Sequence, residues 1–495
     1  MKRPGMISKL ARQAFWTALL ATIAAGASVA RAQDKSMPAS KVERLNRAPV
    51  NKEVLRVQLP RPVVVKLKNG LTLMLLEDHK LPTVSFMMRI QPGQLADPND
   101  IPGLASFTAS MLREGTERRT SAQIAAEVDS LGASLAATSN FGASYTSVSA
   151  SGLIDSAPQI LDLMSDIVLH PAFPAAELAQ YKQRAEANLE QNLANPSFLA
   201  QQAFRRVLYG DPPLSITSPT KESIEKVAAA DLKSFHDRHY RPGNTLLGAA
   251  GDFKPDEMRA LIEKYFGDWA GAAEPSMAWP KAAAPQSARI TLVDRPASVQ
   301  TYIIGGDRAI RRTDPDYYAL VVMNQILGGG PQSRLFLDLR EEHGYTYGSY
   351  SAINAELYPG DWRALAPVRT PVTDGSMTQF GYEFKRISSE PVPQAELDDA
   401  RRAIVAGFAL SLEQPSEMLQ DWLTTQSFGL PADYWDKYPD HIGAVDAAAV
   451  QAAAKKYVDV DHMQWICVGD RKQIQDVLAK YGSVTVVDAE GKPEN

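Results

Sequence analysis

Cysteine is nearly absent from this sequence, with Cys467 as the single example among 495 residues. One cysteine cannot form an internal disulfide, so a disulfide-stapled scaffold is excluded and the cysteine content does not report the redox compartment. Cys467 lies in the apolar run 465–468, which is typical of a small buried side chain. A basic run is also missing and the formal net charge is −5, which argues against a nucleic-acid-binding protein.

Long apolar runs are equally scarce, and the only one long enough to suggest a membrane segment is the uncharged run 13–30 at the N-terminus. Ala30-Arg31-Ala32 ends this run, and four basic residues precede it (Lys2, Arg3, Lys9 and Arg12). The pattern predicts a secretory signal peptide that is cleaved after Ala32. The alternative is a membrane anchor, which the short run and its many Ala and Gly residues disfavour. We expect an exported mature chain without a membrane span, periplasmic if the source is a Gram-negative bacterium.

The chain repeats itself, which is the strongest sequence signal for its fold. Pro-x-Ala-Glu-Leu begins at Pro174 and Pro393, and Pro-Ser begins at Pro196 and Pro415, so both copies lie 219 residues apart (393 − 174 and 415 − 196). Shorter matches at 227 and 445 and at 251 and 469 keep an offset of 218 (445 − 227 and 469 − 251). One nearly constant register indicates duplication. We predict an α+β protein of two similar halves, each a mainly antiparallel sheet with helices packed on it.

The length and the repeat define the domain boundaries, since 495 residues exceed what one core supports. Residues 271–288 lose periodicity and gain Pro and Ala, which is typical of a linker. We divide the chain into a signal peptide (1–32), an N-terminal arm (33–57), a first half (58–270), the linker (271–288), a second half (289–485) and a tail (486–495).

Local patterns in the first half predict several elements. Asn69-Gly70 between the apolar runs 63–67 and 71–76 predicts a tight hairpin. A strand follows at 84–90. A helix is predicted over 121–131, with Thr120 or Ser121 as its cap, and another over 223–238.

The segment 327–351 is the most distinctive part of the chain. Gly328, Gly329 and Gly330 allow a sharp turn and a close approach to another backbone. A helix is expected to open at 331–333 and to stop at Gly344, and a strand to begin at 345–347. Arg340 in the last helical turn and Tyr347 beyond it are then able to project into one cleft.

The run Gly-Gly-Gly, Ser-Arg-Leu-Phe and Leu-Arg-Glu-Glu-x-Gly-x-x-Tyr resembles the C-terminal half of the pitrilysin/insulinase-like (M16 family) metallopeptidases. The resemblance implies two halves that face each other around a chamber. It implies that Arg340 and Tyr347 reach substrate near a zinc ion held by the other half. Gly328, Gly329 and Gly330 are then expected to contact the peptide substrate or gate its entry.

Catalytic members of that family carry His-x-x-Glu-His on a helix of the first half, with a distal Glu as third zinc ligand. The matching framework here is 103–111, where Ser106 and Ser110 replace the two His and Ala109 replaces the general base. Serine hydroxyls are not zinc ligands in proteins. The distal position falls on Glu186 by spacing or on Glu190 by local pattern, and both stay open. We expect no metal or other cofactor to be bound by this chain.

Other chemistries find little support. Ser106 and Ser110 lack the Gly-x-Ser-x-Gly or Ser-x-x-Lys context of serine hydrolases. His236 and His239 stand three residues apart without a further ligand nearby, so we interpret them as structural. We assign no chemistry to His343, which follows two Glu at a helix end.

The resemblance implies a non-catalytic subunit of a heteromeric exported zinc peptidase that degrades peptides or unfolded polypeptides. Arg340 and Tyr347 would donate to the substrate carbonyl as charge develops there, while a homologous subunit with His-x-x-Glu-His would hold the zinc. A heterodimer is the simplest arrangement. Two alternatives remain: a scaffold or peptide-binding module without a catalytic role, and an autonomous peptidase with an unrecognised site.

Overall fold

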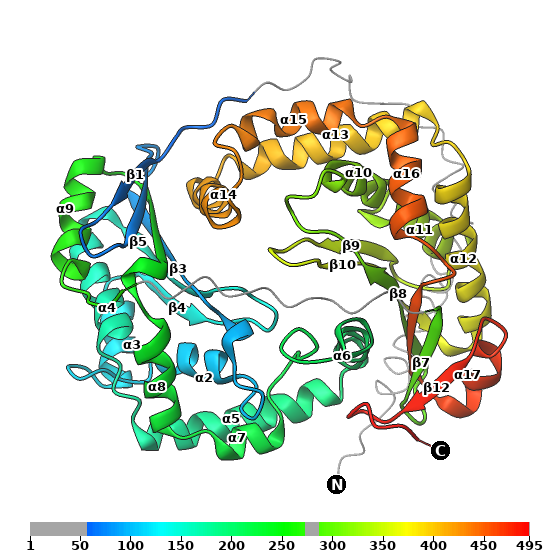
Figure 1. The fold of residues 1–495 in the computed structure, drawn as a ribbon, viewed down its shortest axis with the longest axis horizontal. Helices are drawn as coiled ribbons and strands as arrows, with labels where there is room; N and C mark the ends of the chain where they lie inside the picture. The colour runs from blue at the N-terminus through cyan, green and yellow to red at the C-terminus, as the bar shows by residue number, and fades with distance from the viewer. Residues whose placement is uncertain (1–56, 273–286, 495) are drawn as a thin grey trace, which may run out of the picture. The chain divides into compact units, whose positions relative to one another are not determined.

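The computed structural model describes residues 57–272 and 287–494 (Figure 1). The signal peptide, nearly all of the arm and most of the linker expected from the sequence lie outside the described residues. Within the described ranges, no helix is both long and apolar enough to cross a bilayer. Two six-stranded sheets organise these ranges, one in each half of the sequence.

The first sheet has the order β1-β2-β6-β3-β5-β4. Only β2 and β6 pair in parallel; the other neighbours are antiparallel. The predicted hairpin at Asn69-Gly70 is confirmed, with Gly70 at φ 98° in the left-handed region that favours glycine. The strands are β1 (Val63–Lys66), β2 (Thr72–Glu77), β3 (Thr83–Ile90), β4 (Ser134–Thr138), β5 (Thr146–Leu153) and β6 (Thr245–Gly251).

Helices of the first half largely follow the sequence expectations. Thr120 caps α3 through a reciprocal capping box with Gln123, as the local pattern predicts. The helix expected over 223–238 is wrong: Val227 has an extended ψ of 133°, and the chain forms two helices there. The helices are η2 (Gln94–Ala96), α2 (Leu104–Met111), α3 (Ser121–Ser130), η3 (Ile154–Ser156), α4 (Ala157–Leu169), α5 (Ala175–Leu193), α6 (Pro196–Tyr209), α7 (Lys221–Lys226), α8 (Ala229–His239), η4 (Pro242–Asn244) and α9 (Pro255–Phe266).

The second sheet has the order β12-β7-β11-β8-β10-β9 and repeats the first. The run β7-β11-β8-β10-β9 matches β2-β6-β3-β5-β4 in order and in pairing direction. The edge strands differ, because β12 joins in parallel where β1 joins antiparallel. Its strands are β7 (Arg289–Asp294), β8 (Gln300–Arg308), β9 (Tyr350–Asn354), β10 (Asp361–Arg369), β11 (Gln464–Gly469) and β12 (Val484–Val487).

The helices of the second half carry the same duplication. Pro196 begins α6 and Pro415 begins α14, so equivalent helices start 219 residues apart (415 − 196). The helices are α10 (Tyr317–Gly328), α11 (Arg334–Phe336), η5 (Leu337–Glu342), η6 (Thr370–Val372), α12 (Thr373–Ser389), α13 (Gln394–Ser411), α14 (Pro415–Phe428), α15 (Tyr434–Ala444), α16 (Ala447–Tyr457) and α17 (Arg471–Leu478).

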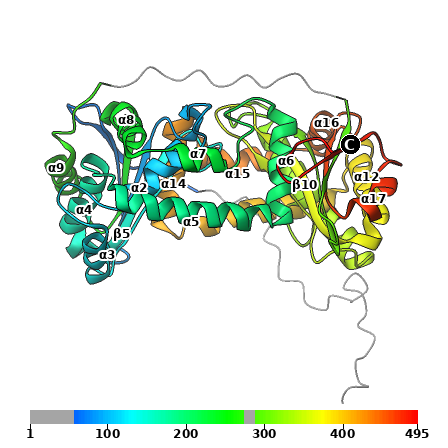
Figure 2. The ribbon, with the colours of Figure 1, turned by 90° about the horizontal axis from the view of Figure 1, so that it is seen from below.

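Each half donates one helix to the sheet of the other. α6, which follows the long helix α5, packs on β8 and β11 of the second sheet, and α14 packs on β2 and β6 of the first (Figures 1 and 2). A Cβ added at Gly306 of β8 would lie 2.8 Å from the Phe204 ring of α6. A Cβ at Gly248 of β6 would lie 2.7 Å from Leu419 of α14. These glycines therefore allow the exchanged helices to seat closely on the two sheets.

Candidate functional site

Arg340 and Tyr347 contact each other at the end of a short helical segment. The guanidinium carbon of Arg340 lies 4.7 Å from the centroid of the Tyr347 ring and 4.8 Å from that of Phe336. Both distances fall in the range of cation–π contacts. Arg340 Nε also lies 3.4 Å from a carboxylate oxygen of Glu341. The arginine is therefore held by two rings and one carboxylate.

The ring of Tyr347 is exposed to solvent, while the preceding residue, Thr346, is held by hydrogen bonds. The exposed fraction of Tyr347, 84%, is the highest among the large hydrophobic side chains of the described residues. Thr346 donates its hydroxyl to the carbonyl of Pro367 at 2.6 Å and forms an isolated bridge with Val368. An exposed ring on an anchored loop can contact a ligand without a rearrangement of the fold.

The local structure around this pair differs from the prediction. The segment 345–347 does not begin a strand; β9 starts only at Tyr350. The helix is also unusual, because α11 continues as a π-helical turn, η5. Gly344 ends this segment at φ 63°, as predicted.

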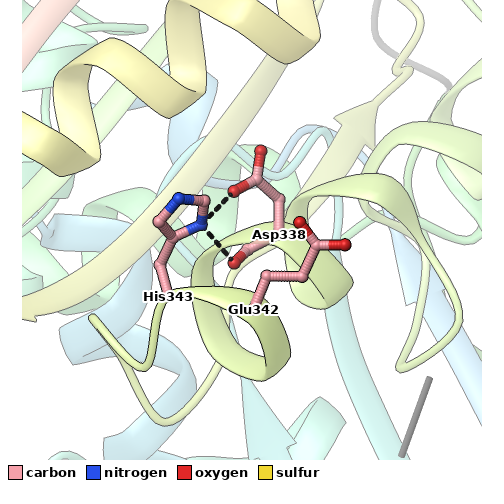
Figure 3. A group of neighbouring side chains, drawn as sticks. All are labelled: Asp338, Glu342 and His343. Atoms are coloured by element: carbon pink, nitrogen blue, oxygen red, sulfur yellow. Dashed lines mark hydrogen bonds and ion pairs between the residues drawn. The ribbon is translucent and has the colours of Figure 1, made fainter. Parts of the chain in front are cut away.

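Buried contacts attach the segment to the second half. Arg334 of α11 is almost fully buried, and its Nε and Nη2 donate to the two carboxylate oxygens of Glu396 on α13, both at 2.8 Å. Such a bidentate pair fixes direction as well as distance. Asp338 and Glu342 of η5 and the following residue, His343, gather beside this pair and line one pocket with it (Figure 3).

The three glycines predicted to contact substrate lie where α10 ends. A Cβ at Gly328 would lie 2.4 Å from the backbone nitrogen of Ser351, and one at Gly329 would lie 2.6 Å from Gln325. A Cβ at Gly330 would meet only one atom, 3.8 Å away. Gly328 thus has a packing reason, the close approach of α10 to β9, and contact of these residues with substrate stays a prediction.

α2 carries the altered zinc motif and begins at a buried carboxylate. Asp97 accepts hydrogen bonds from the backbone N–H of Gly103 at 2.7 Å and of Ala105 at 2.8 Å. This arrangement satisfies donors at the helix N-terminus that have no partner within the helix. Burial raises the pKa of Asp97 to about 7, although these two hydrogen bonds lower it.

The three altered positions do not fit a zinc ion. Ser110 accepts a hydrogen bond from the Tyr181 hydroxyl at 3.0 Å, and burial raises the pKa of Tyr181, which keeps it a donor. Ala109 is fully buried and Ser106 is half-buried. Zinc in proteins takes Cys, His, Asp or Glu, and α2 contains none of these. The structure therefore assigns no zinc-dependent step to α2.

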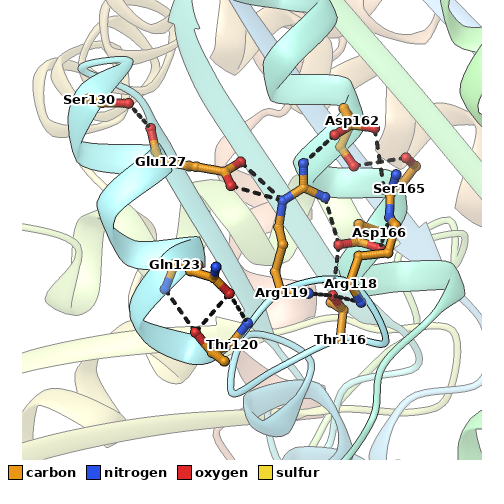
Figure 4. Close-up of polar contacts among 10 residues, drawn as sticks. All are labelled: Thr116, Arg118, Arg119, Thr120, Gln123, Glu127, Ser130, Asp162, Ser165 and Asp166. Atoms are coloured by element: carbon orange, nitrogen blue, oxygen red, sulfur yellow. Dashed lines mark hydrogen bonds and ion pairs between the residues drawn. The ribbon is translucent and has the colours of Figure 1, made fainter.

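The segment after α2 is fixed by an ion network on α4 (Figure 4). Asp166 is fully buried and accepts from Thr116 Oγ1, Arg118 Nε and Arg119 Nη1, each at 2.8 Å. Arg119 also pairs with Asp162 and with Glu127 of α3. The network joins the chain that leaves α2 to both following helices.

The other candidate residues named from the sequence, His236, His239, Glu186 and Glu190, lie on helices of the first half. His236 is buried, with its Nε2 2.8 Å from the carbonyl of Val168, and burial lowers its pKa. His239 is buried against the Phe235 ring at 4.5 Å. On α5, Glu186 is half-buried and Glu190 is exposed, so which of them occupies the distal position stays open. The structural interpretation of His236 and His239 is consistent with these contacts.

The structure thus brings Arg340 and Tyr347 together and keeps the altered motif within the first half, where α2 packs on α5, α8, β4 and β5. Sequence reasoning missed Tyr181 as the partner of Ser110. The two residues lie 71 positions apart, and no local pattern links them.

Comparisons with known proteins agree with this architecture. The family model described as Insulinase (Peptidase family M16) matches residues 73–215, and the model described as Peptidase M16 inactive domain matches residues 226–404. An uncharacterized zinc protease of Mycobacterium tuberculosis is 27% identical over 322 residues, covering 64% of this chain and 73% of the relative. One of Bacillus subtilis is 24% identical over 285 residues, covering 57% and 68%.

Solved structures show the same fold. The crystal structure of a peptidase M16 inactive domain from Pseudomonas fluorescens has a TM-score of 0.77 and 28% identity, covering 83% of this chain and 98% of that chain. A protease from Helicobacter pylori, with a TM-score of 0.75 and 16% identity over 83% of this chain and 100% of that one, shows likeness of fold alone. The α+β fold of this chain, with two six-stranded mixed sheets and packed helices, is that of M16 peptidases. This chain belongs to the M16 (insulinase/pitrilysin) family and contains two M16 domains.

Proposed function

We propose that this chain is the non-catalytic subunit of a heteromeric M16 zinc peptidase, and that it binds substrate and assists cleavage. The observation that carries the proposal is a contrast within one chain. α2 offers only hydroxyls and a methyl group where a zinc site needs ligands and a base, while Arg340 and Tyr347 are retained, stacked and accessible. The mycobacterial relative is named an uncharacterized zinc protease, and the Pseudomonas structure is described as a peptidase M16 inactive domain.

In this proposal, the substrate is a peptide or unfolded polypeptide, and a homologous subunit with His-x-x-Glu-His supplies the zinc and the general base. Tyr347 donates its hydroxyl to the carbonyl oxygen under attack. Arg340 donates from a fixed fork to the same oxygen or to a neighbouring peptide carbonyl. Donors aimed at an oxygen where charge develops are worth several kcal/mol in such sites.

The test uses the purified mature chain, alone and mixed with a His-x-x-Glu-His subunit of the same organism, on an unfolded peptide. We expect no cleavage by the lone chain and zinc-dependent cleavage by the mixture. Arg340→Ala and Tyr347→Phe should each lower turnover by roughly 10²–10³-fold, the loss seen when an oxyanion donor is removed. Arg402→Ala and Tyr265→Phe, on other helices, serve as matched controls. Unchanged turnover in both site variants would favour the scaffold alternative.

The proposal includes export, which rests on the first 32 residues of the sequence. If the signal peptide is cleaved as proposed, the mature chain begins at Gln33. N-terminal mass analysis of the protein from a periplasmic extract tests this. A chain that keeps Met1 in that extract would contradict it.

A further inference from the structure

The cluster of Asp338, Glu342 and His343 is the one place in the described residues where three groups able to hold a metal ion meet. One ligand atom from each lies within 4.8 Å of the other two (Figure 3). Asp338 is buried, whereas Glu342 and His343 are exposed. A solvent ion can therefore reach the cluster.

The π-helical turn creates this grouping. In η5 the backbone N–H of His343 donates to the carbonyl of Asp338 at 3.1 Å, five residues back. A hydrogen bond of that span places residue i+5 over residue i, which a regular α-helix does not do. His343 Nδ1 consequently lies 2.8 Å from Asp338 Oδ1 and 3.1 Å from its carbonyl oxygen. π-helical turns of this kind are frequent at functional sites.

The other nitrogen of His343 has a separate neighbour. Its Nε2 lies 3.4 Å from the side-chain amide nitrogen of Gln379 on α12. Metal-binding histidines commonly hold their second ring nitrogen in a hydrogen bond, which fixes the tautomer and the ring orientation. Gln379 can accept from Nε2–H through its amide oxygen, because amide orientation follows the hydrogen-bond network. Nδ1 faces Asp338, and a cation bound there would replace its contacts with Asp338 Oδ1 and with the Asp338 carbonyl.

Unbalanced negative charge surrounds the cluster. One pocket on this face is lined by five carboxylates and two arginines: Asp338, Glu342, Glu383, Glu390 and Glu396 against Arg334 and Arg386. Arg334 is committed to Glu396, and Arg386 pairs with Glu383 and Glu390. Within the described residues, neither Asp338 nor Glu342 forms an ion pair with a lysine or arginine.

A second observation points to a missing cation. Glu383 lines the same pocket, its side chain is only 3% exposed, and its Oε2 has no hydrogen-bond partner among the described residues. Asp338 Oδ1 is also buried, and His343 Nδ1 lies 2.8 Å from it. Buried carboxylate oxygens are normally satisfied, since leaving them without partners is costly. A buried carboxylate oxygen without a hydrogen-bond partner, in the same pocket as a buried carboxylate whose close neighbour is a histidine, suits a bound cation.

We propose that Asp338, Glu342 and His343 bind a divalent metal ion of the zinc class, with Glu383 facing the ion through a water molecule. Two carboxylates and one imidazole are a ligand set that Zn²⁺ accepts, with a fourth position for water. The ion joins the first and last parts of η5 and so holds the turn to which Arg340 belongs. The site is separate from α2 and does not depend on the proposed peptidase role.

The test is zinc binding by the purified mature chain after treatment with EDTA, followed by calorimetry and metal analysis. We expect one equivalent of Zn²⁺ and a higher thermal midpoint with zinc than without it. Asp338→Asn and His343→Gln should each weaken binding by at least about tenfold and abolish the thermal shift. Circular dichroism checks that Asp338→Asn still folds, and His343 is exposed enough for its variant to fold in any case.

His79→Gln is the matched control. His79 also contacts two carboxylates, Glu77 and Asp252, but through opposite ring nitrogens, so they cannot share one ion with it. This variant should bind zinc as the wild type does. Absence of saturable binding, or equal binding by wild type and both cluster variants, would overturn the inference.

The outcome also separates this inference from the proposed function. Zinc held at Asp338 and His343 by a lone chain that cleaves no peptide supports both. Zinc-dependent cleavage by the lone chain, lost in His343→Gln, would sustain the metal site and reject the non-catalytic role.

Discussion

Substitution of Asp166 tests how the chain segment that follows the altered zinc motif is held in place. Asp166 is fully buried on α4 and anchors Thr116, Arg118 and Arg119, the residues that follow α2 (Figure 4). Burial alone would raise the pKa of Asp166, but the hydrogen bonds from Arg118, Arg119 and Thr116 outweigh it and hold the pKa below its usual range. The carboxylate is therefore ionised and paired in the folded state. Asp166→Asn keeps the shape and removes the charge.

The contacts of Asp166 determine how much unfolding free energy Asp166→Asn should lose. Breaking a buried ion pair from one side costs about 3–5 kcal/mol. Arg119 would keep Asp162 and Glu127 as partners, and Arg118 is half exposed, so neither arginine is left fully unpaired. The expected loss of unfolding free energy is therefore at the lower end, about 3 kcal/mol. Asp162→Asn is the control: its side chain is 29% exposed, and such pairs contribute up to about 1 kcal/mol.

Urea unfolding followed by circular dichroism measures both variants, and hydrogen exchange of α4 localises the effect. Because the folded pKa of Asp166 is lowered, its stabilising contribution is present above the ordinary carboxyl pKa of about 4 and is lost as pH falls through the folded value. The gap between wild type and Asp166→Asn should therefore narrow in acid. A loss no larger than that of Asp162→Asn, or a gap that widens in acid, would refute the reasoning.

Two further predictions concern the same framework. Arg89 of β3 is buried and donates to Ser427 and Thr424 of the exchanged helix α14, each at 3.2 Å. Arg89→Met should therefore lower the unfolding free energy by about 2 kcal/mol, measured by urea titration. A change below about 0.5 kcal/mol, the size typical of surface substitutions, would contradict this prediction. Burial raises the pKa of Asp97 in the folded state to about 7. Between pH of about 4 and about 7, Asp97 is therefore protonated in the folded chain and ionised in the unfolded chain. The unfolding free energy should fall as pH rises through this range. Asp97→Asn should flatten that part of the pH profile, and an unchanged slope would show that Asp97 is ionised throughout.

Local sequence patterns determined those features whose physical cause is itself local. Asn69-Gly70 specifies a turn because glycine accepts a positive φ there, and Thr120 specifies a helix start because its side chain reaches the backbone three residues on. The repeat with an offset of 219 predicted two matching sheets. The absence of zinc ligands and of a general base at Ser106, Ala109 and Ser110 follows from the identity of these residues alone. The family resemblance rested on two other short patterns, the run from Gly328 to Tyr347 and the framework 103–111, and the comparisons confirm the family.

Tertiary structure alone decided how distant segments meet, because contact free energy depends on packing that no short window contains. α6 and α14 exchange sheets since Gly306 and Gly248 admit the side chains of the opposite half. The π-helical turn η5 places His343 over Asp338, five residues back, which no local sequence pattern indicated. Residue type alone leaves α2 without a side chain of the kinds that bind zinc, whereas the conformation of the chain at 338–343 brings together three groups able to hold a metal ion.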